Sequence, residues 1–169
     1  MITVDEIVAR VRAGTSLADL ELFNMDLRGL DLSGAKLAGA RFTMVDMRGA
    51  DLSGARAPNA VFEGTKLCGA SLRNGAFHQA MFPDADLSGA RLDGANLYQA
   101  MFQRAVCQHA RFVDADLTYA DFAHADVSGA DFTGASLFRA GFHRTREDGA
   151  IFTQRALALG DDQLPAHLF

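Results

Sequence analysis

The sequence of 169 residues contains no tryptophan, three prolines and two cysteines. Two cysteines are too few for a disulfide framework, and Cys68 and Cys107 lack metal-ligand spacing, so we expect free thiols. No apolar run reaches about eighteen residues, and residues 1–6 lack the basic start and apolar core of a signal peptide. These absences predict a soluble, cytoplasmic protein that does not insert into a membrane.

Several patterns of enzymes and cofactor-binding proteins are also missing. There is no glycine-rich phosphate loop followed by Lys and Ser or Thr, no His-Glu-x-x-His and no Gly-x-Ser-x-Gly. The five histidines are scattered along the chain. The formal net charge of -5 argues against direct nucleic-acid binding, which requires a basic surface. We therefore expect no enzymatic activity, no cofactor and no metal site.

An alanine recurs every five positions along most of the chain. When residues 25–154 are divided into 26 pentads, alanine occupies the first position in 20 of them. The segments 50–54 (Ala-Asp-Leu-Ser-Gly) and 130–134 (Ala-Asp-Phe-Thr-Gly) show the pattern in full. A period of five fits neither the 3.6-residue period of a helix nor the two-residue period of a strand. The pattern predicts a solenoid.

The central residue of the pentad shows how many pentads make one coil. Phenylalanine occupies this position at intervals of twenty residues, at Phe42, Phe62, Phe82, Phe102, Phe122 and Phe142. Glycine shows the same interval at Gly29, Gly49, Gly69, Gly89, Gly129 and Gly149. Four pentads therefore form one coil, and the phenylalanines should stack in an internal column at roughly the 4.8 Å spacing of strands.

The pentad resembles that of the pentapeptide repeat proteins, with a small residue, Asp or Asn, Leu or Phe, a polar residue and often Gly. The resemblance covers about three quarters of the chain. It implies an all-β solenoid, a right-handed quadrilateral β-helix with Ala and Leu or Phe inside, here of about six to seven coils. Three places depart from the pattern: Ala57 is a small central residue, Gly75 replaces the usual Ala, and Glu147 is central in the pentad 145–149. We expect a bulge or a frayed end at that last pentad.

Both ends of the solenoid are predicted to carry caps. We assign residues 1–24 to an N-terminal helical cap and lead-in, with a helix over 3–13 that begins at a Thr3/Glu6 capping box. The repeats occupy 25–154, and residues 155–169 form a C-terminal cap or dimerisation tail, with a short helix over 154–159. The apolar tail residues Leu164, Leu168 and Phe169 either fold back as a lid or form a homodimer contact, since the resembling family often pairs through its C-terminal ends.

The outward positions carry the candidate partner site. Val61, Met81 and Met101 precede the central phenylalanine in three successive coils, where Asp or Asn is usual. The preceding face adds the aromatic residues Tyr98, Tyr119 and Phe138. Together they predict an exposed apolar patch that binds a protein partner. The alternative is that these side chains only pack on one another along the rod.

The resemblance also implies a second function. The best-known activity of the family is inhibition of DNA gyrase or related topoisomerases by imitation of duplex DNA, for which Asp31, Asp51 and Asp131 are the candidate acids. Arg73, Arg91 and Arg111 interrupt these acids, and mixed charges cancel beyond a Debye length of about 8 Å. We therefore favour a non-enzymatic protein-protein interaction module over DNA mimicry. The partner stays open, including an adaptor role in a bacterial secretion system.

Overall fold

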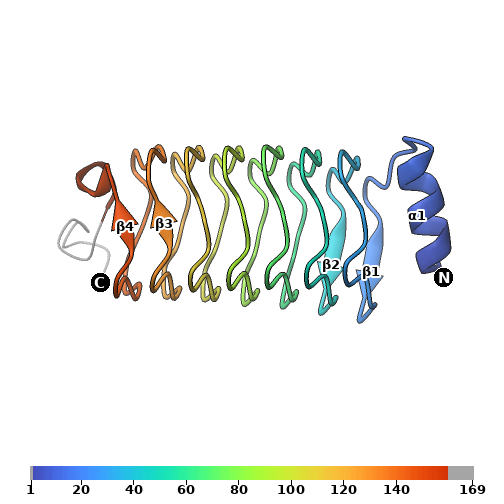
Figure 1. The fold of residues 1–169 in the computed structure, drawn as a ribbon, viewed down its shortest axis with the longest axis horizontal. Coiled ribbons are helices and arrows are strands. Elements are labelled where there is room, and N and C mark those ends of the chain that lie inside the picture. Colours follow the sequence, from blue (N-terminus) through green and yellow to red (C-terminus); the bar gives the residue numbers. More distant parts are fainter. Residues whose placement is uncertain (1, 160–169) are drawn as a thin grey trace.

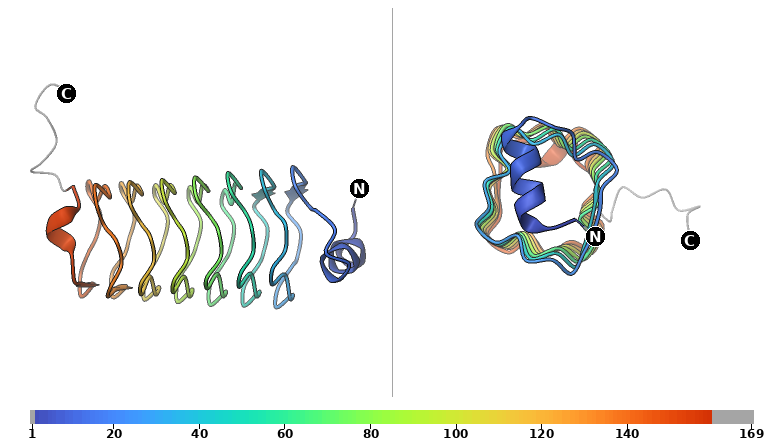
Figure 2. Two further views of the ribbon diagram at one scale, coloured as in Figure 1. Left: turned by 90° about the horizontal axis from the view of Figure 1, so that it is seen from above. Right: turned by 90° about the vertical axis from the view of Figure 1, so that its right-hand side faces the viewer.

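The chain winds into a stack of four-sided coils that forms a rod, with a helix across its N-terminal end (Figure 1). The structure is a computed structural model, and it describes residues 2–159. Viewed along the rod, successive coils superimpose as a square (Figure 2). This solenoid is the right-handed β-helix that the sequence predicts.

Short parallel pairings hold neighbouring coils together. The elements are α1 (Val4–Arg12), β1 (Glu21–Phe23), β2 (Arg41–Thr43), β3 (Asp131–Phe132), β4 (Ile151–Phe152) and the 3-10 helix η1 (Arg155–Leu157). β1 pairs with β2 and β3 pairs with β4, both in parallel. Between them, isolated parallel bridges join residues twenty apart, such as Met81 and Met101. This register confirms the twenty-residue coil.

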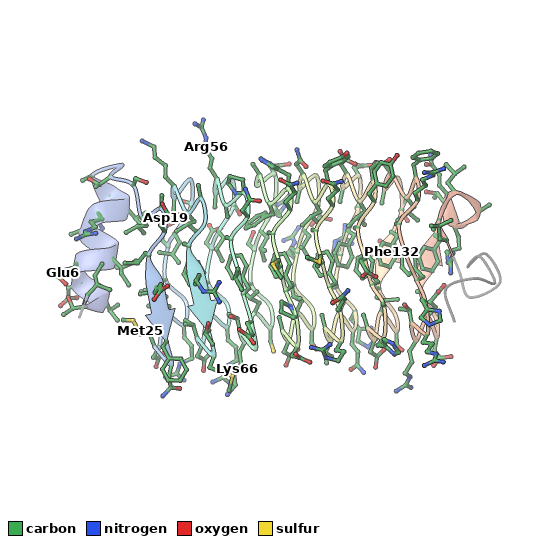
Figure 3. All side chains as sticks on the ribbon, turned by 180° about the vertical axis from the view of Figure 1, so that it is seen from behind. Glu6, Asp19, Met25, Arg56, Lys66 and Phe132 are labelled. Carbon is green, nitrogen blue, oxygen red and sulfur yellow. The ribbon has the colours of Figure 1, made fainter. Side chains whose placement is uncertain are left out.

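We number the four faces in chain order. Leu22 and the Phe42 column lie on face 1, Leu27 on face 2, Leu32 on face 3 and Leu37 on face 4. Each pentad from 20–24 to 145–149 turns a corner at its last residue, which adopts positive φ, as at Gly54 (65°). Glycine fits this left-handed conformation without a Cβ penalty, and this explains its frequency at the corners. Outward side chains leave the rod in different directions, as Arg56 and Lys66 do in Figure 3.

Phenylalanine rings fill much of the interior. On face 1 the rings from Phe42 to Phe142 stack in parallel, with centroids 4.6 to 5.0 Å apart. Face 3 carries a second column, in which Phe132 stacks on Phe112 at 4.8 Å and on Phe152 at 4.7 Å. The two columns meet edge to face across the interior, with Phe112 and Phe122 5.6 Å apart. The expected phenylalanine column is confirmed, and the second column fills the C-terminal half of the core.

Ala57 and Gly75, two of the departures from the repeat, both lie beside Phe77. Phe77 is the one phenylalanine in the face 4 column of the described coils, and it is fully buried. Ala57 stands one coil before it in the same column and is also fully buried. A Cβ added to Gly75 would collide with the Phe77 ring. The two small residues therefore make room for one large side chain.

The N-terminal cap follows its predicted mechanism. The Thr3 hydroxyl accepts a hydrogen bond from the Glu6 backbone, and the Glu6 carboxylate accepts one from the Thr3 backbone. α1 buries Ile7 against the core. The Leu17 backbone already donates to Lys36 at 2.8 Å. The first coil thus begins near residue 17, before the predicted boundary at 25, because the lead-in residues already keep the pentad register.

The C-terminal end stays regular where we expected a bulge or fraying. The pentad 145–149 keeps its turn, and Arg155 donates to both oxygens of Glu147 at 2.8 and 2.9 Å. η1 spans only part of the predicted helix over 154–159, and Leu159 instead pairs with Gly141. The tail residues Leu164, Leu168 and Phe169 lie outside the described residues.

Candidate protein-binding surface

A shallow groove follows the corner between faces 4 and 1. Met81, Met101 and Tyr119 form its apolar part, and Asn59, Gln79, Gln99 and Asp121 form its polar rim. We call these seven residues the corner groove. Met81 and Met101 are ladder neighbours on face 1. The Gln79 side-chain amide donates to that of Gln99 at 3.1 Å, which braces the rim across two coils.

Three aromatic side chains continue this surface toward the C-terminal end. Tyr119 packs edge to face against Tyr98 on one side and Phe138 on the other, each with centroids 5.9 Å apart. All three are exposed, Phe138 by 49%. We call them the aromatic ladder. The expected alternative, packing of these side chains on one another, is therefore observed, but it leaves a broad apolar surface in contact with solvent.

Val61 does not belong to this surface. It is only 9% exposed, whereas Met81 and Met101 are partly exposed. Val61 stands in the ladder between Arg41 and Met81. At the roughly 4.8 Å spacing of the ladder, two longer side chains cover a short β-branched one. The apolar row predicted from the sequence thus narrows to the two methionines.

Sequence reasoning missed Gln79 and Gln99. Each is the last residue of a face 4 pentad, and the two lie one coil apart. They form the corner that leads to Met81 and Met101 on face 1. The twenty-residue register could have placed them beside Met81 and Met101. The hydrogen bond between them depends on side-chain conformation, so it could not be predicted from the sequence.

The acids proposed for DNA mimicry act within their own turns. Asp31, Asp51 and Asp131 each accept a hydrogen bond from the backbone two residues later, at 3.0, 2.9 and 2.9 Å. The Thr133 hydroxyl and backbone N–H lower the pKa of Asp131, and Arg111 lowers it further. The geometry of these carboxylates thus serves the turn.

Basic side chains break the acidic surface on two faces. On face 2, Arg28 binds Asp26 and Arg48 binds Asp46, each with a shortest contact of 2.6 Å. On face 3, the ladder runs from Asp51 to Asp131 through residues of other kinds: Ser71, Arg91 and Arg111. No unbroken acidic strip forms on either face within residues 2–159.

The thiols and other reactive groups offer little chemistry. Partial burial and a hydrogen bond to Asp86 raise the pKa of the Cys68 thiol to about 11, so its nucleophilic thiolate is scarce at neutral pH. Cys107 is fully buried, and burial raises its pKa as well. Residues 2–159 contain no group of three His, Cys, Asp or Glu placed to hold a metal ion. Across the same range, no helix has the length and apolar character needed to cross a membrane.

A comparison with known protein families gives a match along the whole rod. A family model for pentapeptide repeats, with eight copies, matches residues 15–54, 46–82, 82–118 and 115–154. No curated protein sequence matches the chain significantly.

Solved structures are also similar to the chain. One is the plasmid-mediated fluoroquinolone resistance protein QnrB1, with 19% identity, a TM-score of 0.42, and coverage of 82% of this chain and 92% of that one. Another is a pentapeptide repeat protein of the Arabidopsis thaliana thylakoid lumen, with 28% identity, a TM-score of 0.35, and coverage of 68% and 69%. A third is HetL of the cyanobacterium Nostoc, involved in heterocyst differentiation regulation, with 24% identity, a TM-score of 0.26, and coverage of 94% of each chain.

Proposed function

Because the chain belongs to the pentapeptide repeat family, we propose that it is a non-enzymatic, rigid module that binds a partner protein through the corner groove and the aromatic ladder. The observation that carries the proposal is the continuous apolar surface that Met81, Met101, Tyr98, Tyr119 and Phe138 form along one corner of the rod. Exposed apolar patches of this kind mark partner sites, and Met and Tyr adapt to varied contacts.

The physical properties of the surface indicate the kind of partner that would fit it. Met81 and Met101 offer polarizable apolar contacts, while Gln79 and Gln99 offer amide groups along the rim. The fitting partner is a protein surface with an apolar centre and hydrogen-bonding groups at its edge. The rod is preorganised, so little conformational entropy is lost in its backbone when it binds. Free Cys68 and Cys107 support action in the reducing cytoplasm.

DNA mimicry directed at gyrase was the alternative function. That mechanism needs an unbroken acidic strip that replaces the phosphates of DNA. On face 3, Arg91 and Arg111 stand between Asp51 and Asp131, and the turn acids are paired with backbone groups. We therefore assign this function a lower rank, and the experiment below includes it.

The test compares capture of proteins from the native host by purified variants. Met101→Arg places a charge in the groove, and Val106→Arg is its matched control, because Val106 is an exposed apolar residue at the same pentad position on the adjacent face. A partner bound by the wild type and by Val106→Arg, but about tenfold more weakly by Met101→Arg, supports the proposal.

Two outcomes would reject it. If the two variants lose the purified partner equally, the groove is not the binding site. If gyrase subunits bind all three forms with equal affinity, the partner is gyrase and it uses another face. Circular dichroism of each variant establishes that the rod is folded.

A further inference from the structure

Three arginines of face 3 converge on one carboxylate. Arg73, Arg91 and Arg111 come from three successive coils, and Asp93 lies among them. The distances from Asp93 oxygens to the nearest guanidinium nitrogen are 3.8 Å for Arg73, 3.6 Å for Arg91 and 3.0 Å for Arg111. We call these four residues the arginine cluster.

The arginine cluster has many more hydrogen-bond donors than acceptors. Arg111 donates to Asp93 Oδ1 at 3.1 Å, whereas the buried Asp93 Oδ2 has no hydrogen bond within residues 2–159. The side chains of Arg73 and Arg91 donate no hydrogen bond to any residue of that range. Since each guanidinium carries five N–H donors, most donors of the cluster have no hydrogen-bond acceptor within residues 2–159.

Other arginines of the rod are satisfied differently. Arg28, Arg48 and Arg104 each bind a carboxylate through two nitrogens, those of Asp26, Asp46 and Asp84. Their side chains are 48 to 59% exposed, close to the 46 to 50% of the clustered arginines. The difference therefore lies in the number of carboxylates and not in exposure.

The cluster also carries an excess of positive charge. Three guanidiniums share Asp93, and the next carboxylate is that of Asp131, 3.7 Å from Arg111. Asp51 lies beyond Ser71 in the ladder, and Asp114 lies with its carboxylate over Gly134. Arg91 and Arg111 are ladder neighbours, and like charges placed so close destabilise each other. An added anion would relieve this repulsion.

We propose that the arginine cluster binds an acidic segment of a protein, whose carboxylates take the unused donors of Arg73, Arg91 and Arg111. Guanidinium groups match carboxylates in shape and bind them through paired hydrogen bonds. A protein segment fits better than a nucleic acid, because a segment can place a few carboxylates on the three guanidiniums alone. The continuous phosphate backbone of a nucleic acid would also meet Asp51, Asp114 and Asp131, and its binding requires a more basic surface than a chain with a net charge of -5 offers.

The cluster lies apart from the surface described above. Face 3 is opposite face 1 in the square cross-section seen in Figure 2, and Met81 and Met101 stand on face 1. This second surface goes beyond the proposed function and does not depend on it. With both surfaces occupied, the rod would bridge two protein segments.

A labelled deca-glutamate peptide tests the proposal by fluorescence anisotropy at an ionic strength of about 0.05 M, where surface electrostatics are weakly screened. The cluster variant combines Arg73→Gln, Arg91→Gln and Arg111→Gln. The control variant combines Arg28→Gln, Arg48→Gln and Arg104→Gln, which changes the net charge by the same amount. We expect the cluster variant to bind about tenfold more weakly than the wild type and the control about twofold more weakly.

Four outcomes would overturn the proposal. Equal losses in the two variants would show non-specific attraction, and the absence of binding to the wild type would show no site. Equal or tighter binding of a ten-nucleotide thymidine strand would assign the cluster to nucleic acid, and tighter saturable binding of inorganic phosphate would assign it to a free anion. Thermal melts establish that both variants retain the fold.

Discussion

Phe77 shows how a single side chain shapes its neighbours. Its ring packs near Phe62 and Phe82, with centroids 6.2 and 6.3 Å away. The small residues Ala57 and Gly75, which both depart from the repeat, accompany this ring, and Phe77 is itself the one phenylalanine in the face 4 column of the described coils. Departures from a repeat can therefore be compensations for one another, which a comparison of single positions does not reveal.

Gly75→Ala should destabilise the rod, because the new Cβ collides with the Phe77 ring. We expect a loss of about 1–3 kcal/mol, the usual range for overpacking a core. Urea unfolding measures it. The rescue variant Gly75→Ala/Phe77→Leu should lose less than the sum of the two single changes, since a smaller side chain frees the space. Strict additivity would contradict this account of Gly75.

The aspartates before the central residues act first on their own turns. Asp26 accepts a backbone hydrogen bond from Arg28 at 3.1 Å and two from its guanidinium at 2.8 and 2.6 Å. The pentad therefore selects Asp for a local reason, independent of any partner. The abundance of Asp at this position therefore reflects the needs of the turn and does not indicate a binding function.

Asp26 should titrate well below an ordinary aspartate. The Arg28 side chain and then the Arg28 backbone lower its pKa from 3.8 to about 2. Because the folded pKa lies below the unfolded one, the stabilisation is present above about pH 4 and is lost as the pH falls through about 2. NMR titration of the carboxyl carbon measures the value. Arg28→Gln should raise the pKa toward 3.8, and an unchanged value would contradict the assigned cause.

At the scale of elements, the two ends are capped by different means. α1 covers the first coil with its apolar face, which buries Ile7. The capping box of Thr3 and Glu6 stabilises the start of this helix. At the other end, Arg155 lies over the rings of Phe142 and Phe152, with its guanidinium carbon 4.7 and 5.7 Å from their centroids, and it binds Glu147. Glu147 was expected to weaken this coil, yet its carboxylate anchors the side chain that covers the phenylalanine columns.

Arg155→Ala should loosen the last coil. The change removes the cover of Phe142 and Phe152 and both hydrogen bonds to Glu147. Hydrogen exchange at the Phe142 and Leu159 amides should accelerate about tenfold, because end coils open by themselves in a solenoid. Arg146→Ala serves as control, since Arg146 is 69% exposed and its contacts are 3.6 Å long. Equal acceleration in β1 would contradict a local role.

At the scale of the whole molecule, each coil contacts the coils before and after it. Stability then sums over neighbouring coils, while recognition depends on which outward residues align on one face. The corner groove draws on coils in the middle of the rod, and so does the arginine cluster on the opposite side. Both surfaces therefore lie where the ladder is supported from both directions.

The fold, the twenty-residue coil and the main phenylalanine column could all be predicted from the amino-acid sequence. The reason is that inward positions face the same steric demand in every coil, so their residue types repeat. The second column at Phe112, Phe132 and Phe152 was equally readable, since it has the same spacing. The lead-in before residue 25 keeps the same five-residue register, although Thr15 and Leu20 stand where alanine is usual.

The contacts between outward side chains could be identified only in the folded rod. It buried Val61 between longer neighbours, turned three arginines onto Asp93, and placed Arg155 over two rings. Outward side chains have several rotamers of similar free energy, so residues in adjacent coils select among them. The repeat specifies the face and the coil from which each outward side chain extends. The side chains of the neighbouring coils specify what it contacts.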